Sequence, residues 1–208
     1  MQLLLNVPHI DEDEVKSLGA KWNTEFEKWY VPDKSNYHKF SKWFNNPNTN
    51  LIICDHIYVV VGEQECFKCN NTTSVISLAT DSFFEIENGE MSYIEGDLYL
   101  IEDVYCIPNS ISKYLSEEYK FNYGHSKTTN SNYYGNHCDV CGVLQGNFYL
   151  YCEPDSPFFM DDVEKVKNLK IFKISLKCDL ELTGFVGMKY DENSINYKTQ
   201  IIDIEFDA

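Results

Sequence analysis

The hydrophobic residues of this chain fall mostly into short continuous or alternating runs, which is the pattern of β-strands. Runs of strand length lie at residues 3–7, 51–62, 73–86, 97–107, 147–152, 170–188 and 199–208. In the last of them Ile202, Ile204 and Phe206 share one face, so we expect this segment to close a sheet. Residues 124–136 are rich in Asn, Ser and Thr and predict a polar loop. Strands should therefore outnumber helices.

The first 44 residues combine strand and helix periodicities. After the strand at residues 3–7, an acidic segment predicts a short helix that Asp11 caps and Gly19 ends. Residues 20–32 carry two aromatic segments around a polar centre and predict a β-hairpin. Helical spacing then returns at Tyr37, Phe40, Trp43 and Phe44. The expected order of elements is βαββα.

A polar linker at residues 45–50 divides the chain. We predict an N-terminal βαββα domain at residues 1–46 and a second domain at residues 51–208. The second domain is expected to be mostly antiparallel and β-rich, with helices at residues 109–119 and after Ser156. The predicted fold class is α+β.

Composition changes this picture mainly through charge. The 208 residues include 33 acidic and 17 basic ones, the net charge is -16, and every basic residue is Lys. Such a chain repels phosphate backbones and lacks the guanidinium fork that binds phosphates and guanine edges. Nucleic-acid binding by the whole surface is therefore disfavoured, and a basic protein is the more natural partner. The sequence contains no apparent secretion signal or membrane span, so its eight cysteines indicate a reducing, cytoplasmic setting.

The clearest chemical signal is a pair of Cys-x-x-Cys motifs, Cys66 with Cys69 and Cys138 with Cys141. Four thiolates are the ligand set of a closed structural zinc site, and Gly142 suits the tight turn that points two sulfurs at one ion. Each motif lies between strand-like segments, as in a zinc ribbon, although residues 70–137 make an unusually long separation. We predict one shared structural zinc ion with a zinc-ribbon-like knuckle pair.

Other interpretations of the cysteines stay open. Two separate zinc sites, each completed by His137 or another Cys, would use the same motifs. Thiol–disulfide chemistry or plain buried thiols are further alternatives, although neither motif has the strand-then-helix context of a thioredoxin motif. Four isolated cysteines lie in apolar runs and are expected to be core thiols: Cys54, Cys106, Cys152 and Cys178.

The segment from Asp81 to Ser112 has eight acidic residues and no Lys. The ordinary interpretation of such a segment is a solvated surface, and the alternative is a docking face for a basic partner. The residues that we assign to this predicted face are Glu85, Glu87, Glu90, Glu95, Asp97, Glu102 and Asp103.

Residues 4–32, LLNVPHIDEDEVKSLGAKWNTEFEKWYVP, resemble a small bacterial domain of unknown function. The signature is N-V-P, an acidic helix, then L-G-A-K-W and K-W-Y-V-P, and the resemblance extends over residues 4–44. Plasmid primases of the TraC type share this domain, and short bacterial proteins pair it with two Cys-x-x-Cys motifs. Asn23 stands where the family usually has Asp. The resemblance implies a bacterial, cytoplasmic, zinc-binding protein, and it does not imply primase activity because no segment looks like a primase catalytic domain.

Motifs of catalysis are missing from the sequence: it has no phosphate-binding glycine loop, nucleophile elbow or H-E-x-x-H motif. We therefore expect a non-enzymatic, zinc-stabilised protein that docks a basic partner, most concretely an immunity- or antitoxin-like inhibitor of a bacterial toxin. The alternative is a nucleic-acid-associated accessory module that uses the N-terminal domain. That domain holds the lysines Lys16, Lys21, Lys28, Lys34, Lys39 and Lys42. The sequence does not define the oligomeric state.

Overall fold

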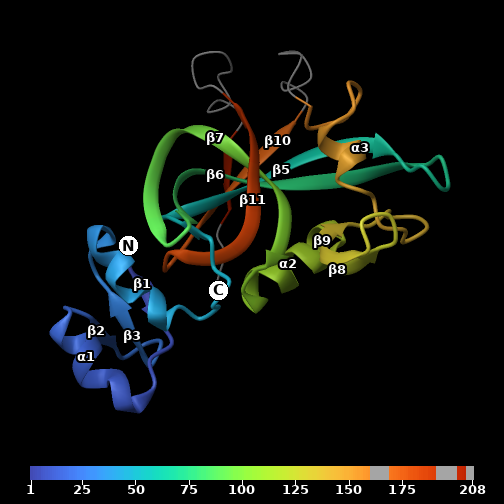
Figure 1. Cartoon of the computed structure of the whole chain (residues 1–208). Helices are drawn as coiled ribbons and strands as arrows, with labels where there is room; N and C mark the ends of the chain where they lie inside the picture. The colour runs from blue at the N-terminus through green and yellow to red at the C-terminus, as the bar shows by residue number, and fades with distance from the viewer. Residues whose placement is uncertain (160–168, 191–200, 205–208) are drawn as a thin grey trace.

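Small elements form an N-terminal unit in the computed structural model, which describes residues 1–159, 169–190 and 201–204 (Figure 1). These elements are β1 (Leu3–Leu5), the 3₁₀ helix η1 (His9–Asp11), α1 (Glu12–Ser17), β2 (Lys21–Asn23), β3 (Lys28–Val31) and the 3₁₀ helix η2 (Lys34–Trp43). The three strands pair antiparallel in the order β1-β3-β2, so the predicted hairpin is confirmed.

The predicted second α-helix of this unit is a 3₁₀ helix, so the βαββα order is not confirmed. Its buried residues, Tyr37, Phe40 and Trp43, recur at every third position. A helix with three residues per turn places such residues in one row, whereas the 3.6 residues of an α-helical turn would carry them around the axis. The Asp33 side chain caps the start of η2 by accepting a hydrogen bond from the Ser35 N–H.

A larger sheet occupies most of the described chain after residue 50. Its strands are β4 (Leu51–Ile53), β5 (His56–Glu65), β6 (Thr72–Glu87), β7 (Glu90–Cys106), β8 (Phe121–Ser126), β9 (Ser131–Asn136), β10 (Lys170–Ser175), β11 (Leu180–Tyr190) and β12 (Ile201–Ile204). The order is β12-β10-β5-β6-β4-β11-β7-β9-β8, and all neighbours are antiparallel except β10 and β12. The mostly antiparallel, β-rich α+β class is therefore confirmed, as is the closing strand at the sheet edge.

The long strands β6 and β7 pair with each other and so close part of this sheet into a ring. β6 pairs with β5, β4 and β7, and β11 joins β4 to β7. Leu51, Phe83 and Ile101 come from three strands of the ring and lie in one buried core. The helix α2 (Asn109–Tyr119) adds Ile111 and Leu115 to the same core, at the positions where the sequence predicts a helix.

The N-terminal unit packs directly on the larger sheet. Tyr37 and Phe40 of η2 lie in one hydrophobic cluster with Ile52 of β4 and Phe84 of β6. All four side chains are at least nine-tenths buried. The predicted domain boundary between residues 46 and 51 stays a prediction, and the two parts of the chain share a core across it.

Polar contacts fix the same junction. The Tyr37 hydroxyl donates to Asp179 Oδ2 at 2.6 Å, and Lys34 Nζ lies 2.6 Å from Asp55 Oδ2. The buried carboxylate of Glu181 accepts four hydrogen bonds from the end of the N-terminal unit. Their donors are the Asn45 and Asn46 backbone N–H groups, the Asn45 side-chain amide and the Thr49 hydroxyl.

Two segments differ from the sequence-based predictions. Residues 124–136, expected to be a loop, belong to the hairpin of β8 and β9, and residues 147–152, expected to be a strand, contain the helix α3 (Phe148–Tyr151). Most of the helix predicted after Ser156 lies outside the described residues, as does Phe206. None of the helices in the described part of the chain has the length and apolarity that crossing a bilayer requires.

Candidate functional site

The four predicted metal ligands come together in space. The Sγ atoms of Cys66, Cys69, Cys138 and Cys141 all lie within 4.8 Å of one another. Cys66 and Cys141 are separated by 3.7 Å, and so are Cys69 and Cys138, so each of these short distances joins one motif to the other. The first motif lies at the tip of the β5–β6 hairpin, and the second follows β9 (Figure 1). The long insert therefore leaves the site and returns to it.

Both motifs fold into the same turn, called a knuckle below. In each knuckle the backbone N–H of the first Cys donates to the carbonyl oxygen five residues later. The N–H four residues after that Cys donates to the carbonyl oxygen of the Cys. These bonds, each 2.9 Å, are Cys66 to Asn71, Asn70 to Cys66, Cys138 to Val143 and Gly142 to Cys138. The fourth residue has positive φ in both knuckles, 55° at Asn70 and 67° at Gly142. Asn tolerates this left-handed region, and that is the sequence signal that our prediction missed.

Two side chains hold the second knuckle against β6. Asn136 pairs with the backbone of Ile76 in both directions, at 2.7 and 2.8 Å. Asp139 accepts from the Ser74 N–H at 2.9 Å and from the Thr73 hydroxyl at 3.1 Å. Because β6 begins immediately after the first knuckle, these bonds place the two knuckles side by side.

Backbone dipoles in the knuckles favour the thiolates of Cys66 and Cys138, whereas burial and the neighbouring cysteine sulfurs raise the pKa of Cys141 to about 11. Burial alone would raise the pKa of Cys66, but the backbone N–H groups of Cys69 and Lys68 point at its sulfur and lower that pKa to about 6. The Cys141 N–H likewise lowers the pKa of the Cys138 thiol. Gln145 is buried, and its Nε2 atom lies 3.5 Å from the Cys66 sulfur. The side-chain amide of Gln64 donates to Oε1 of Gln145 at 2.9 Å. Such outer contacts orient metal ligands.

The geometry fits four thiolates around one ion. In a tetrahedral site with Zn–S bonds of 2.3 Å, the sulfurs lie about 3.8 Å apart, close to the two separations of 3.7 Å. His137 is not a member of this cluster, and its Nδ1 lies 3.0 Å from the Gly135 carbonyl oxygen. A shared four-cysteine site thus agrees with the structure better than two sites completed by other residues.

The four isolated cysteines do not all lie in a core, contrary to prediction. Cys54 is fully buried, Cys106 and Cys178 are half-buried, and Cys152 is exposed. The apolar run around Cys152 forms α3, whose buried residues are Leu150 and Tyr151.

The structure separates the seven acidic residues that the sequence groups together. Asp97, Glu102 and Asp103 have internal partners: Asp97 pairs with Lys189 at 2.8 Å, Glu102 accepts from the Met188 N–H, and Asp103 accepts from Asn147. Glu95 is exposed, but strand alternation places it on the same side of β7 as Met91 and Tyr93.

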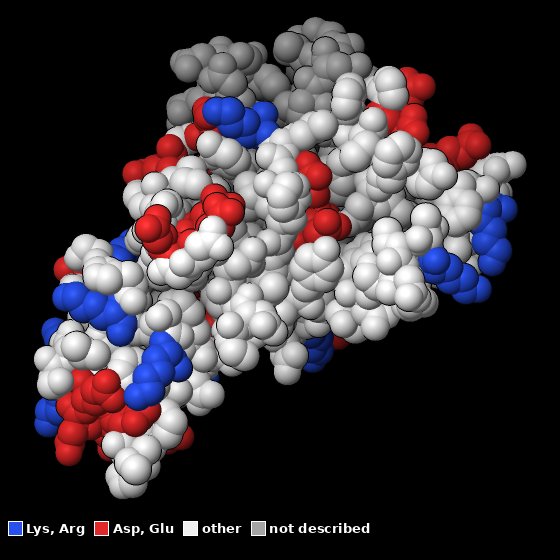
Figure 2. Space-filling model, viewed as in Figure 1, with Lys and Arg blue, Asp and Glu red and all other residues white. Residues whose placement is uncertain are grey.

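The remaining three, Glu85, Glu87 and Glu90, form what we call the acidic tip of the β6–β7 hairpin. All three are exposed and line a shallow depression with Asn88 and Ser92. Carboxylates gather over this end of the hairpin in Figure 2, while many of the lysines in that view lie over the N-terminal unit. No ion pair joins the tip to a lysine within the described residues. The opposite face of the hairpin, with Phe84 and Ile86, packs on the N-terminal unit.

We expect Glu87→Lys to raise the free energy of unfolding by about 0.5–1 kcal/mol. Glu87 lies directly opposite Glu90 across the hairpin, where like charges destabilise and opposite charges stabilise the pair. Urea unfolding at low and high salt measures the change, which should shrink as salt screens it. Glu63→Lys is the matched control because Glu63 is exposed and opposite Ser74. An equal gain in both variants would contradict a local repulsion.

A second polar cluster was not predicted. His56 Nε2 lies 2.7 Å from Asp81 Oδ1, and the Tyr58 hydroxyl donates to Asp81 Oδ2 at 2.8 Å. Asp81 occupies the irregularity in the pairing of β6 with β7, far from His56 in sequence. These contacts link β5 to β6 within the sheet.

Comparisons with known proteins concern a short part of the chain. Residues 2–45 match the family model of a domain of unknown function (DUF5710). Two DNA primases TraC from Escherichia coli are similar, one 46% identical over 48 residues and the other 49% identical over 39 residues. These segments are 23% and 19% of this chain, and they span 3% and 4% of the primases. No solved structure matches the chain. The resemblance predicted for the N-terminal segment is confirmed.

Proposed function

We propose that this protein is a non-enzymatic binding protein, stabilised by one structural zinc ion, that docks a basic protein partner through the acidic tip. The concrete version is an immunity- or antitoxin-like inhibitor that occludes the active surface of a basic toxin in the cytoplasm. The observation that carries the proposal is the presentation of Glu85, Glu87 and Glu90 on one face of a hairpin whose other face is anchored in a core.

Zinc is the ion that we propose for the four-cysteine site. A set of four thiolates whose sulfurs lie within 4.8 Å of one another suits Zn²⁺, and the free cysteines of the chain suit a reducing compartment. Four protein ligands complete the coordination of the ion and leave no position for a substrate, so its role is to hold the two knuckles together.

Electrostatic attraction gives the acidic tip its proposed role. A cluster of carboxylates without internal cations projects a negative field that raises the rate of encounter with a basic surface. The same cluster repels itself, since Glu87 and Glu90 are opposite each other. A lysine-rich or arginine-rich partner would remove that repulsion on binding.

The test is capture of partners from the native host by the tagged protein at low salt. We expect one basic protein, released by added salt and lost with the triple variant Glu85→Gln, Glu87→Gln, Glu90→Gln. The control variant removes three exposed carboxylates elsewhere: Glu63→Gln, Glu117→Gln and Glu118→Gln. If the purified partner associates equally fast with both triple variants, the acidic tip is not the docking surface.

A second candidate function is a nucleic-acid-associated accessory module. The observation in its favour is the similarity to the DNA primases TraC. Trp22 on the edge strand β2 is 49% exposed, and an exposed aromatic ring can stack on a base. A gel shift with short single-stranded DNA tests it on the whole chain, because the N-terminal unit shares its core with the sheet. Binding that is lost in Trp22→Ala would support this function over the first.

A further inference from the structure

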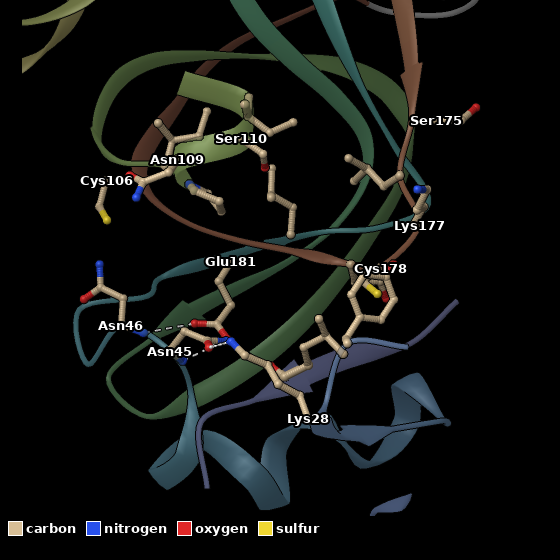
Figure 3. Close-up of a pocket in the computed structure, with 18 residues that line it drawn as sticks. Lys28, Asn45, Asn46, Cys106, Asn109, Ser110, Ser175, Lys177, Cys178 and Glu181 are labelled. Atoms are coloured by element: carbon tan, nitrogen blue, oxygen red, sulfur yellow. Dashed lines mark hydrogen bonds between the residues drawn. The ribbon is translucent and has the colours of Figure 1, made fainter. Parts of the chain in front are cut away.

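A cavity of about 540 Å³ lies where the N-terminal unit meets the larger sheet (Figure 3). Leu4, Phe26 and Lys28 approach it from the N-terminal unit, the start of α2 from a second side, and residues 175–181 from a third. A volume of a few hundred cubic ångströms at the meeting of two structural units is typical of small-molecule sites. Neither the four-cysteine site nor the acidic tip contributes to it.

The wall of the cavity is largely apolar. Its hydrophobic side chains come from elements that are distant in sequence, so the cavity exists only when the N-terminal unit is packed on the larger sheet. They are Leu4, Phe26, Ile107, Pro108, Ile111, Leu176 and Leu180. A ligand that fills this space therefore needs an apolar body.

The charged groups that line the cavity differ in whether they already have partners within the protein. Glu181 is occupied by its four hydrogen bonds from residues 45–49, two of which appear as dashed lines in Figure 3. Asp179 accepts from the Tyr37 hydroxyl and from the Asp55 N–H. By contrast, Lys28 and Lys177 are exposed at the cavity, and the Lys28 ammonium has one neutral partner, the side-chain oxygen Oδ1 of Asn45. Because both carboxylates are occupied within the protein, the two lysines are the charged groups of the lining that a ligand can meet, and they favour an anion.

The start of α2 adds donors on the side of the cavity away from Lys28. The helix begins at Asn109, and Pro108 precedes it with no side-chain cap. Asn109, Ser110 and Ile111 line the cavity, and the first two are labelled in Figure 3. The N–H groups of the first turn of a helix have no partner within the helix. These groups and the lysines leave the cavity with donors and cations around an apolar centre.

We propose that this cavity binds a small amphipathic anion, an apolar body that carries one carboxylate or phosphate group. The apolar body would lie against Phe26, Ile111 and Leu180, and the anionic group would meet the α2 donors or Lys177. This site is independent of the proposed function, since no residue of the acidic tip or the knuckles takes part.

Titration calorimetry with three eight-carbon probes tests the proposal on the whole protein: octanoate, octyl phosphate and octanol. We expect at least one anion to bind ten times or more as tightly as octanol, and to raise the melting temperature with concentration. Whichever anion binds more tightly identifies the group as a carboxylate or a phosphate. Equal binding of octanol, or binding of none of the three, would overturn the proposal.

Two variants locate the site. Ser110→Asp places a carboxylate at the start of α2, where it complements the helix dipole and competes with a bound anion, so the fold is kept while anion affinity falls at least tenfold. Lys177→Gln should weaken the anions and leave octanol unchanged. Lys127→Gln is the control, since Lys127 is an exposed lysine beyond β8 that does not line the cavity. Unchanged anion affinity in both site variants would place the binding elsewhere and overturn the proposal.

Discussion

Replacing Cys138 by Ser is expected to abolish stoichiometric zinc binding and to lower the free energy of unfolding by roughly 5 kcal/mol or more. A structural zinc ion contributes on the order of 10 kcal/mol to small zinc-dependent folds. Cys138 is 2% exposed, and its sulfur lies 3.7 Å from that of Cys69. Its loss leaves three thiolates with an incomplete coordination shell in a buried place. Metal analysis by mass spectrometry and urea unfolding would measure the two effects.

The matched control for this prediction is Cys152→Ser. Cys152 is exposed and lies outside the four-cysteine site, so zinc content and stability should both stay within error. Stripping zinc from the unaltered chain with a chelator should reproduce the instability of Cys138→Ser. Zinc loss with an unchanged free energy of unfolding would show that the ion does not stabilise the fold.

Glu181→Ala is expected to lower the free energy of unfolding by about 4 kcal/mol. The carboxylate is 8% exposed and accepts four hydrogen bonds, at 2.8 to 3.2 Å, from residues 45–49. A hydrogen bond to a charged group contributes about 1.5–3 kcal/mol, and removing the acceptor leaves several buried donors unpaired. Partial access of water to those donors limits the loss. Urea unfolding followed by tryptophan fluorescence would give the value.

Two further variants make that result specific. Glu181→Gln keeps the shape and one acceptor oxygen, so its cost should fall between those of the native chain and Glu181→Ala. Glu117→Ala removes an exposed carboxylate of α2 and should change stability by less than about 0.5 kcal/mol. A cost under about 1 kcal/mol for Glu181→Ala would mean that the apolar cluster alone holds the N-terminal unit in place.

The members of the four-cysteine site could be predicted from sequence because the pattern of each pair is local. Each Cys-x-x-Cys pair lies in its own tight turn, and the spacing of two residues defines that turn. The return of the chain over residues 70–137 could not be predicted, because it depends on contacts such as that of Asn136 with Ile76. A single asparagine in a polar stretch gives no sign of its distant partner.

For the acidic segment at residues 81–112, the sequence shows the charge but not its arrangement on the surface. Charge density along the sequence is easy to count, but strand alternation and the length of β7 send neighbouring acids to different faces. Asp103 accepts from Asn147, which lies far away in the sequence. Only the carboxylates near the hairpin turn stay together. The sequence therefore shows that residues 81–112 are acidic, but not which of these carboxylates share one face of the structure.

Local pattern also failed where periodicity was ambiguous. The run at residues 147–152 is too short to separate a buried strand from a helical turn, and its backbone forms α3. In η2 the three-residue spacing of Tyr37, Phe40 and Trp43 fits both helix types over a short stretch, and the packed row decides for the tighter one.

An ion bound at the knuckles would act as a reversible cross-link between distant parts of the chain. It would tie residues 66–69 to residues 138–141 and enclose β6, β7, α2, β8 and β9 in one loop closed by metal–sulfur bonds. Closing a loop of about 70 residues reduces the entropy of the unfolded chain by an amount worth about 4 kcal/mol. The acidic tip lies inside that loop. Zinc starvation or oxidation of the sulfurs would open this loop and return that entropy to the unfolded chain.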